Sequence, residues 1–446
     1  MQPRINEGRP GFDMKMEDWL LQYGNADSPQ DELEGIHKFR ALMEGKKVYL
    51  WGAGSVVRLY VDLFKKTGIP VAGLIDKQSH GGTVEGCEVL PPSALLSLGD
   101  PRNTVIVTSA GSTMVAAYIA ADFEALGADL PPIVLGYRLF YALQNLICRR
   151  KVRDGESPEL FLCPMCRTFG STCPVLLDQA GEKHGGNLVL SLAAYGLGTV
   201  CTLKCEYCVE GIPYVPHGKR AFVPMETVIK DIEKFTEACD YIVRLDFCGG
   251  EPFLHPQLEE ILNYAVAVRN IGYFYVITNG TVVPGDSLGA VLCNPRMKVV
   301  ISDYSGQLSL KLVSNIEKTA RKLKESGVST ERRRHLAWSD INSFAPRGLS
   351  SAQMEKAYKS CPFVNSRRLH EGVLYPCLHY FAGVQTGDLA AEPDECLHIH
   401  DIPGKQLAEA IQRYLNQPYV SACDRCLAPF DAPEVPAARQ AEKIKE

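Results

Sequence analysis

The chain carries the sequence Cys201-Thr-Leu-Lys-Cys205-Glu-Tyr-Cys208, in which three and then two residues separate successive thiols. A cubane [4Fe–4S] cluster of the ferredoxin type takes one cysteine thiolate on each of its four irons. A site with only three cysteines leaves one iron open to a small molecule. The spacing therefore indicates chemistry at the cluster rather than electron relay alone.

A second motif, Cys248-Gly249-Gly250-Glu251-Pro252, follows the predicted strand 241–247. Two glycines at the end of a strand let a ligand approach bare backbone beside one carboxylate. The three-cysteine motif with Tyr207 before its last cysteine, followed by Gly-Gly-Glu-Pro, resembles the radical S-adenosylmethionine (radical SAM) superfamily. A zinc knuckle or unbonded core cysteines are the alternative interpretation.

The resemblance implies a specific reaction. SAM would bind the open iron through its amino and carboxylate groups, and one electron from the reduced cluster would cleave it to methionine and a 5′-deoxyadenosyl radical. That radical abstracts a hydrogen atom from the substrate, while the protein orients and shields the reactants. An external one-electron donor such as flavodoxin or ferredoxin is implied as a partner. The SAM-binding residues expected on this basis are Tyr207, Gly249, Gly250, Glu251, Thr278 and Ser302.

Strands and helices alternate through residues 187–345, the expected radical SAM core. Repeated βα units predict a parallel sheet, and in barrels built from them the chemistry gathers at the carboxyl ends of the strands. The resemblance implies a partial (β/α)6 barrel. Its strands are predicted at residues 188–192, 241–247, 273–277, 297–302 and 335–338.

A Rossmann-like α/β domain is predicted at residues 45–140, after a polar leader of residues 1–44. A short apolar strand runs into Gly52-Ala-Gly54, and Asp76 ends the next strand about twenty residues later, where an acidic residue meets a ribose in dinucleotide sites. Val57 occupies the position of the third glycine. Two interpretations therefore stay open, a nucleotide site at Gly52, Gly54 and Asp76 or a docking module without a ligand.

The linker at residues 141–186 contains a smaller group of cysteines. Cys163, Cys166 and Cys173 could form a zinc knot, with Cys148 or His184 as the fourth ligand. Structural zinc requires four ligands in tetrahedral geometry, and the sequence does not identify the fourth.

The region 346–446 supplies a further cysteine set. Four thiolates, from Cys361, Cys377, Cys423 and Cys426, are enough to close a second [4Fe–4S] cluster. The pattern resembles the auxiliary-cluster domain called twitch and part of the longer SPASM domain, although no cysteine follows Cys426. Cys396 is a competing fourth ligand.

A closed auxiliary cluster suggests oxidation of a hydroxyl group. The radical left after hydrogen abstraction must lose one electron, which the cluster can accept, and one proton, which needs a base. The candidate bases are His379, Tyr380, Arg334 and Asp303. Cys248 is a candidate hydrogen donor if the reaction is an epimerisation instead.

The expected protein is thus an α/β radical SAM oxidoreductase with two [4Fe–4S] clusters. The expected substrate is a polar small molecule, namely a sugar, nucleotide-sugar or aminocyclitol. A peptide or protein maturase is the first alternative. A non-catalytic iron–sulfur or zinc scaffold and a SAM-dependent methyl transferase are the others.

Composition agrees with an ordinary globular enzyme. The 446 residues are 46% hydrophobic and carry a net charge of −5. No basic leader precedes an apolar stretch, and no apolar run approaches the length of a membrane span. Sixteen cysteines in so long a chain favour metal binding over disulfides. We therefore expect a cytoplasmic location and no nucleic-acid or membrane partner.

Overall fold

In this computed structural model the chain forms two compact units. The structure describes residues 12–23, 28–54, 56–77, 80–97, 100–109, 119, 122–123, 125–127, 131–134, 136–153, 188–359, 361, 363, 367–427 and 432–441. The described residues up to Arg153 belong to the first unit, and those from Leu188 belong to the second.

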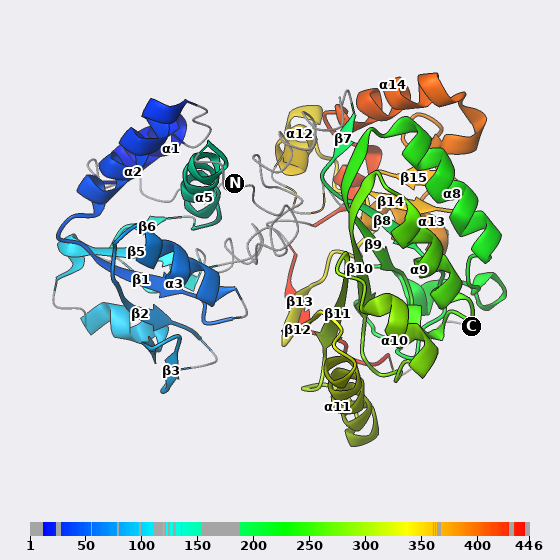
Figure 1. The fold of residues 1–446 in the computed structure, drawn as a ribbon, viewed down its shortest axis with the longest axis horizontal. Coiled ribbons are helices and arrows are strands. Elements are labelled where there is room, and N and C mark those ends of the chain that lie inside the picture. Colours follow the sequence, from blue (N-terminus) through cyan, green and yellow to red (C-terminus); the bar gives the residue numbers. More distant parts are fainter. Residues whose placement is uncertain are drawn as a thin grey trace. The chain divides into compact units, whose positions relative to one another are not determined.

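The first unit is built on a six-stranded sheet with strand order β3-β4-β2-β1-β5-β6 (Figure 1). Only β3 and β4 pair antiparallel, and β1 lies between β2 and β5. This order places a topological switch point at the carboxyl end of β1. The strands are β1 (Lys47–Trp51), β2 (Val71–Ile75), β3 (Thr83–Val84), β4 (Cys87–Leu90), β5 (Thr104–Thr108) and β6 (Ile133–Val134).

Helices from both ends of the first unit share one core with its sheet. Trp19 and Phe39 lie in the expected leader, yet they are buried in the same cluster as the β1 residues Val48 and Leu50. The prediction of a polar leader is therefore wrong for residues 12–43. The apolar residues of the two helices alternate with charged ones in the sequence, so no apolar run marks them. The helices are α1 (Phe12–Tyr23), α2 (Pro29–Met43), α3 (Val57–Lys66) and α5 (Gly136–Arg153), with 3₁₀ turns η1 (Pro92–Ser97) and η2 (Pro101–Asn103).

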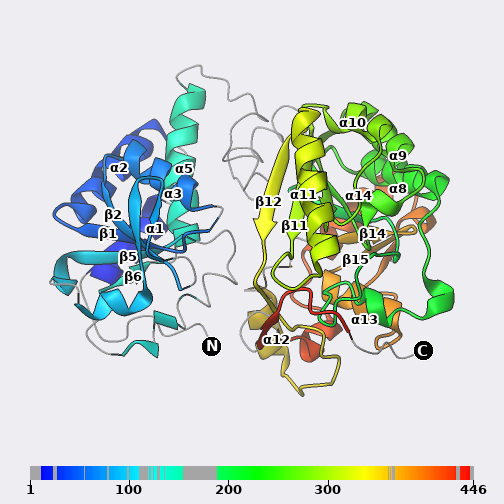
Figure 2. The same cartoon turned by 90° about the horizontal axis from the view of Figure 1, so that it is seen from below.

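The second unit is built on a larger sheet with order β12-β11-β10-β9-β8-β14-β15-β16, and β7 also pairs with β9 (Figure 1). The edge strand β12 lies beside β11 (Figure 2). Strands β8 to β12 are parallel, and β14 continues the parallel run beside β8. An α/β fold with parallel sheets is thus confirmed. The strands are β7 (Val189–Leu190), β8 (Ala193–Gly196), β9 (Tyr241–Cys248), β10 (Ile271–Thr278), β11 (Met297–Asp303), β12 (Thr330–Arg334), β14 (Arg368–His370), β15 (Val373–Tyr375) and β16 (Leu397–His398).

Two predicted strands were misplaced. The first, at residues 188–192, is split between β7 and β8, and it is β8 that leads into the cysteine loop. The fifth is β12, Thr330–Arg334, rather than 335–338. β12 lies at the edge of the sheet and reads Thr-Glu-Arg-Arg-Arg, so a search for apolar runs passes over it.

Helices cover one face of this sheet. Phe247, Phe274 and Ile301 point from their strands into a core that includes Ile232 of α8 and Ile316 of α11. The helices on this face are α8 (Met225–Ala238), α9 (Leu258–Ala267), α10 (Asp286–Leu292) and α11 (Leu310–Glu325). The remaining elements are β13 (Ala337–Ser339), α12 (Ser351–Lys359), α13 (Leu378–Thr386), α14 (Gly404–Leu415), β17 (Glu434–Pro436) and the 3₁₀ turns η4 (Ile212–Tyr214), η5 (His217–Lys219), η6 (Pro252–Leu254), η7 (Ile399–Asp401) and η8 (Ser421–Arg425). Among the described residues, no helix has the length and apolar character needed to cross a membrane.

Candidate functional site

The three motif cysteines lie in the loop after β8, close enough to influence one another electrostatically. Burial raises the pKa of Cys201 and Cys205 to about 12 and that of Cys208 to about 11. The charges of Cys208 and Cys201 raise the pKa of Cys205 further. Three thiolates here need a positive partner, and the irons of a cluster would supply it.

Hydrogen-bond donors surround two of these sulfurs. The Leu203 amide and the Asn279 side chain donate to Cys201 Sγ at 3.4 and 3.5 Å, and Gln440 Nε2 donates to Cys205 Sγ at 3.6 Å. Donors of this kind are typical of iron–sulfur ligands. A cubane spreads its ligands over separate irons, and within the described part of the chain no three His, Cys, Asp or Glu side chains are placed to hold a single metal ion.

The two glycines after β9 allow close backbone packing beside the cysteine loop. A Cβ atom on Gly250 would lie 2.1 Å from the carbonyl oxygen of Val200, and both Gly249 and Gly250 have positive φ angles, +89° and +57°. The Glu251 amide donates to the same carbonyl at 2.8 Å. Any side chain at Gly250 would push the loop away, so the motif fixes the position of Cys201.

The Glu251 carboxylate is fully buried and occupied within the protein. It accepts hydrogen bonds from Thr278 Oγ1 (2.6 Å), the Asn279 amide (2.8 Å) and the Phe253 amide (3.0 Å). Burial raises its pKa to about 7, although these bonds act in the opposite direction. Glu251 therefore orders the loop after β10. The SAM-binding roles of Gly249, Gly250, Glu251 and Thr278 stay predictions. The same loop carries Asn279, whose contact with Cys201 was not predicted.

A family model described as the radical SAM superfamily matches residues 195–290, which contain the three cysteines and the Gly-Gly-Glu motif. This region of the chain matches a radical SAM domain. Such a domain implies a [4Fe–4S] cluster and SAM as cofactors, and the residues around Cys201, Cys205 and Cys208 fit such a cluster.

The curated relatives match only a short stretch of this chain. A GTP 3′,8-cyclase of Stenotrophomonas maltophilia (strain K279a) is 31% identical over 88 residues, which is 20% of this chain and 26% of the relative. A GTP 3′,8-cyclase of Lactiplantibacillus plantarum is 32% identical over 82 residues, or 18% and 24% of the two chains. The chain thus spans about a quarter of the length of these relatives.

Solved structures with some similarity to this chain superpose on it only at low TM-scores. BtrN in complex with AdoMet and 2-DOIA has a TM-score of 0.34 and 16% identity, covering 57% of this chain and 96% of that one. Streptococcus suis SuiB bound to precursor peptide SuiA has a TM-score of 0.28 and 16% identity, covering 43% and 48%.

Two further expected SAM contacts lie at the same edge of the sheet. Tyr207 is half-buried in the cysteine loop, and its hydroxyl accepts a hydrogen bond from Arg439. Ser302, near the carboxyl end of β11, hydrogen bonds to Tyr304. Their binding roles stay predictions.

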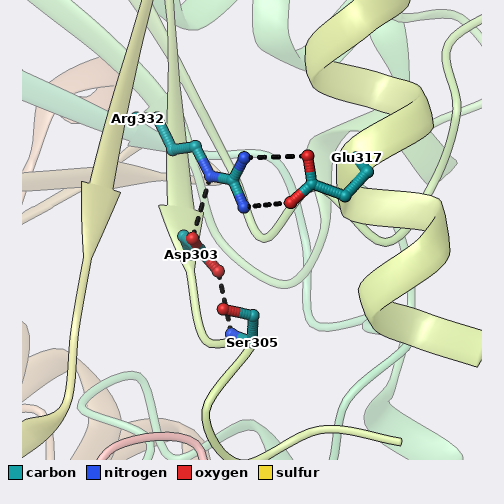
Figure 3. Close-up of polar contacts among 4 residues, drawn as sticks. All are labelled: Asp303, Ser305, Glu317 and Arg332. Atoms are coloured by element: carbon teal, nitrogen blue, oxygen red, sulfur yellow. Dashed lines mark hydrogen bonds and ion pairs between the residues drawn. The ribbon is translucent and has the colours of Figure 1, made fainter. Parts of the chain in front are cut away.

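Asp303 is held in an ion-pair network (Figure 3). Its Oδ1 accepts from the Ser305 amide and its Oδ2 from Arg332 Nε, both at 2.8 Å, while Arg332 forms a second, bidentate pair with Glu317 of α11. Burial opposes ionisation of Asp303, but these hydrogen bonds outweigh it and lower the pKa. A carboxylate with a lowered pKa is a weak base, which argues against the catalytic role of Asp303, and that role stays a prediction.

Asp303→Asn should weaken the fold without removing catalysis. We expect the free energy of unfolding to fall by about 1–3 kcal/mol, because a charged, largely buried hydrogen-bond acceptor is lost. The pH profile of 5′-deoxyadenosine formation should not move. Denaturant unfolding and product chromatography under anaerobic conditions measure the two quantities. Asp286→Asn is the control, since its pair with Lys322 is exposed and should contribute nothing measurable.

His379 is a buried imidazole, and neither ring nitrogen has a hydrogen-bond partner among the residues that the structure describes. It stacks on Phe344 at 4.6 Å, and burial lowers its pKa to about 4. The ring is therefore neutral near pH 7. Its role as a base stays a prediction.

Cys248 is buried at the end of β9 and takes part in a series of polar contacts. Its Sγ accepts from Arg368 Nη1 at 2.6 Å, and Arg368 Nη2 pairs with Glu210, two residues after Cys208. Burial raises the pKa of Cys248 to about 12, so the group is a thiol. This chain of contacts links the cysteine loop to β14.

The expected auxiliary thiols gather in the same unit. Burial raises the pKa of Cys377 to about 12, and the charges of Cys361 and Cys423 raise it further, which places these three close together. Cys426 packs against a separate small cluster with Ile341. Cys396 instead hydrogen bonds to Tyr380, and the charges that act on it are those of Glu395 and Glu392.

Charged side chains line the sheet face opposite the helices, and sequence reasoning missed them. Strand register places Arg368, Asp246, Tyr275 and Lys298 in one row across the sheet. We call the six charged residues the inner-face network: Arg244, Asp246, Lys298, Glu331, Arg333 and Arg368. In β9, Arg244, Asp246 and Cys248 alternate with apolar residues, and this pattern could have predicted a polar face of the sheet.

The expected residues in the first unit form a compact loop. Gly52 has a φ of +119°, and a Cβ atom there would lie 3.0 Å from the Ser109 carbonyl oxygen. Asp76 Oδ2 accepts a hydrogen bond from the Ala53 amide at 2.8 Å, so one carboxylate oxygen orders the loop between Gly52 and Gly54. Nucleotide binding stays a prediction. Cys163, Cys166, Cys173 and His184 lie outside the described residues.

Proposed function

We propose that this radical SAM protein oxidises, or epimerises, a polar small molecule such as a sugar, nucleotide-sugar or aminocyclitol. The carrying observation is the inner-face network. Arg244 and Asp246 pair at 2.8 Å, and Glu331 pairs with Lys298 at 2.6 Å and Arg333 at 2.7 Å. Buried ion pairs contribute little net stability compared with well-packed apolar residues. A binding surface for a polar substrate explains why the chain keeps them.

Glu331 holds its charge at neutral pH, whereas burial raises the pKa of Asp246 despite its pair with Arg244. Burial opposes ionisation of Glu331, but hydrogen bonds from Arg333 and Lys298 lower its pKa to about 2. The aromatic ring of Tyr275 lies under the Arg244 guanidinium at 4.5 Å and near the Lys298 ammonium at 5.4 Å. These contacts fix the donors in place before a substrate arrives, which limits the ordering cost of binding.

When bound, the cluster and SAM supply a radical that removes one hydrogen atom from the substrate. For a secondary alcohol, one electron and one proton must then leave to give the carbonyl. The thiols of Cys361, Cys377, Cys423 and Cys426 would hold the electron acceptor, and His379, neutral and buried two residues from Cys377, is the proposed base. In an epimerisation, the Cys248 thiol would return a hydrogen atom instead and become a thiyl radical, which one electron from the external donor and one proton would convert back to the thiol. The inner-face position of Cys248 favours this as the second candidate.

A substrate panel tests the proposal. We expect nucleotide-sugars or aminocyclitols, but not peptides, to stimulate 5′-deoxyadenosine formation above the substrate-free rate. Lys298→Met should lower kcat/KM for the best substrate about 10- to 100-fold, because a buried charged donor is lost, while substrate-free SAM cleavage is unchanged.

Lys322→Met is the matched control, since Lys322 forms an ion pair with Asp286 on the helical side. Stimulation by peptides alone would contradict the small-molecule assignment and favour the maturase. An unchanged kcat/KM in the Lys298→Met enzyme would show that the inner-face network does not bind the substrate.

A further inference from the structure

The segment from Ala432 to Ala441 lies along the loop that carries the cluster cysteines. Its strand β17 pairs antiparallel with β13, and the chain then continues onto the cysteine loop. The Glu206 amide donates to the Arg439 carbonyl and the Ala441 amide to the Lys204 carbonyl, each at 2.8 Å. Residues more than 230 positions apart in the sequence therefore form a short backbone ladder around Cys205.

Two buried alanines anchor this segment. Ala437 and Ala438 have no exposed surface, and Ala438 packs against Leu203 and Cys205. The φ angle of Ala438 is +56°, a left-handed conformation that costs a non-glycine residue about 1 kcal/mol or more. The surrounding packing holds this strained turn, which directs the next residues toward the cysteine loop.

Gln440 presents an amide N–H to a cluster sulfur in a fixed orientation. Its Oε1 accepts from the Lys204 amide at 2.9 Å, so its Nε2 must be the end that faces Ala438 O at 2.7 Å and Cys205 Sγ at 3.6 Å. Asn279 makes the matching contact to Cys201 from the other side, with its own oxygen held by the Thr281 amide. Two oriented amides thus face two of the three thiols.

Arg439 fixes the aromatic residue between the last two cysteines. Its Nε pairs with Glu206 Oε2 at 2.5 Å, its Nη2 donates to the Tyr207 hydroxyl, and its guanidinium lies 4.9 Å from the centre of the Tyr207 ring. Backbone, amide and guanidinium contacts from one segment therefore reach four consecutive residues of the motif, from Lys204 to Tyr207.

We propose that residues 437–441 form part of the SAM-cluster site and that Gln440 raises the reduction potential of this cluster. A hydrogen bond to a cysteine sulfur withdraws charge from the ligand and stabilises the reduced, more negative cluster. The inference rests on Cys201, Cys205 and Cys208 as cluster ligands and not on the identity of the substrate. Ease of one-electron reduction would then depend on a segment far outside the radical SAM core.

The test is a potentiometric titration of anaerobically reconstituted full-length protein, followed by electron paramagnetic resonance. The signal that changes on addition of SAM identifies the relevant cluster. We expect the midpoint potential to decrease from wild type to Gln440→Leu, which loses the donor, and again to Gln440→Glu, which also adds negative charge. Gln406→Glu, on the exposed surface of α14, is the matched control and should equal wild type.

Equal midpoint potentials in all four proteins would overturn the proposal, as would an equal shift in Gln406→Glu. Iron analysis covers the case in which a variant does not hold its cluster. Loss of about four irons in a Gln440 variant, with Gln406→Glu intact, also supports a contact at the cluster. A wild-type protein without any SAM-responsive signal would instead reject the three cysteines as ligands.

Discussion

The triple variant Cys201→Ala/Cys205→Ala/Cys208→Ala is expected to lower the iron content from about eight to about four atoms per chain after anaerobic reconstitution. The three thiols lie in one loop with donors to two of their sulfurs, and no other cysteine is expected to replace them. Cys205→Ala alone should abolish 5′-deoxyadenosine formation, because SAM cleavage needs the reduced cluster. Iron, labile sulfide and zinc analysis with product chromatography measures both effects.

Cys293→Ala is the control for this experiment, since its thiol is exposed on the helical side of the sheet and bonds to Ser326 O. It should keep about eight irons and full SAM cleavage. Wild-type protein with only about four irons, falling to none in the triple variant, would leave the SAM cluster alone and argue against dehydrogenation. Unchanged iron in the triple variant would reject the ligand assignment.

Cys377→Ala is expected to retain SAM cleavage but to lose formation of the oxidised product by at least about 100-fold, since a missing electron acceptor blocks the second half of the oxidation. The variant should also lose about four irons. Measuring 5′-deoxyadenosine and oxidised product in the same reaction separates cleavage from turnover. Full product formation by the Cys377→Ala protein would contradict the proposal that the auxiliary site accepts the electron.

Cys396→Ala is a close control for that variant. Cys396 is buried in the same apolar cluster that Cys377 packs against, but it hydrogen bonds to Tyr380, whereas Cys361 and Cys423 lie near Cys377. It should keep both iron and product formation. If Cys396→Ala loses iron while a Cys426→Ala protein keeps it, then Cys396, and not Cys426, is the fourth ligand of the auxiliary cluster.

Local sequence patterns predicted the motifs and most elements of the second unit. Spacing identifies Cys201, Cys205 and Cys208, and helical periodicity places α8 and α11 within two residues of their ends. These features are determined by residues close together in the sequence. The pairing of strands that are far apart in the sequence is not, and the pairing of β14 with β8 was therefore not predicted.

The side-chain roles were harder to predict for the same reason. Glu251 and Asp303 are acidic residues at strand ends, and a sequence cannot tell that one is enclosed by the loop after β10 and the other is paired with Arg332. Gln440 contacts a cysteine 235 positions earlier, so no local pattern points to it. Part of the inner-face network could have been predicted from the sequence, because Arg244 and Asp246 interrupt an otherwise apolar strand.

The parallel pairing of β14 with β8 has a consequence for how this protein is assembled. Arg368 pairs with Ala194, so the first core strand is completed only after more than 170 further residues have been synthesised. A fragment that ends near residue 345 would expose the edge of β8 as an unpaired template for aggregation. The radical SAM core and the following segment should therefore unfold as one cooperative unit and resist separation by truncation.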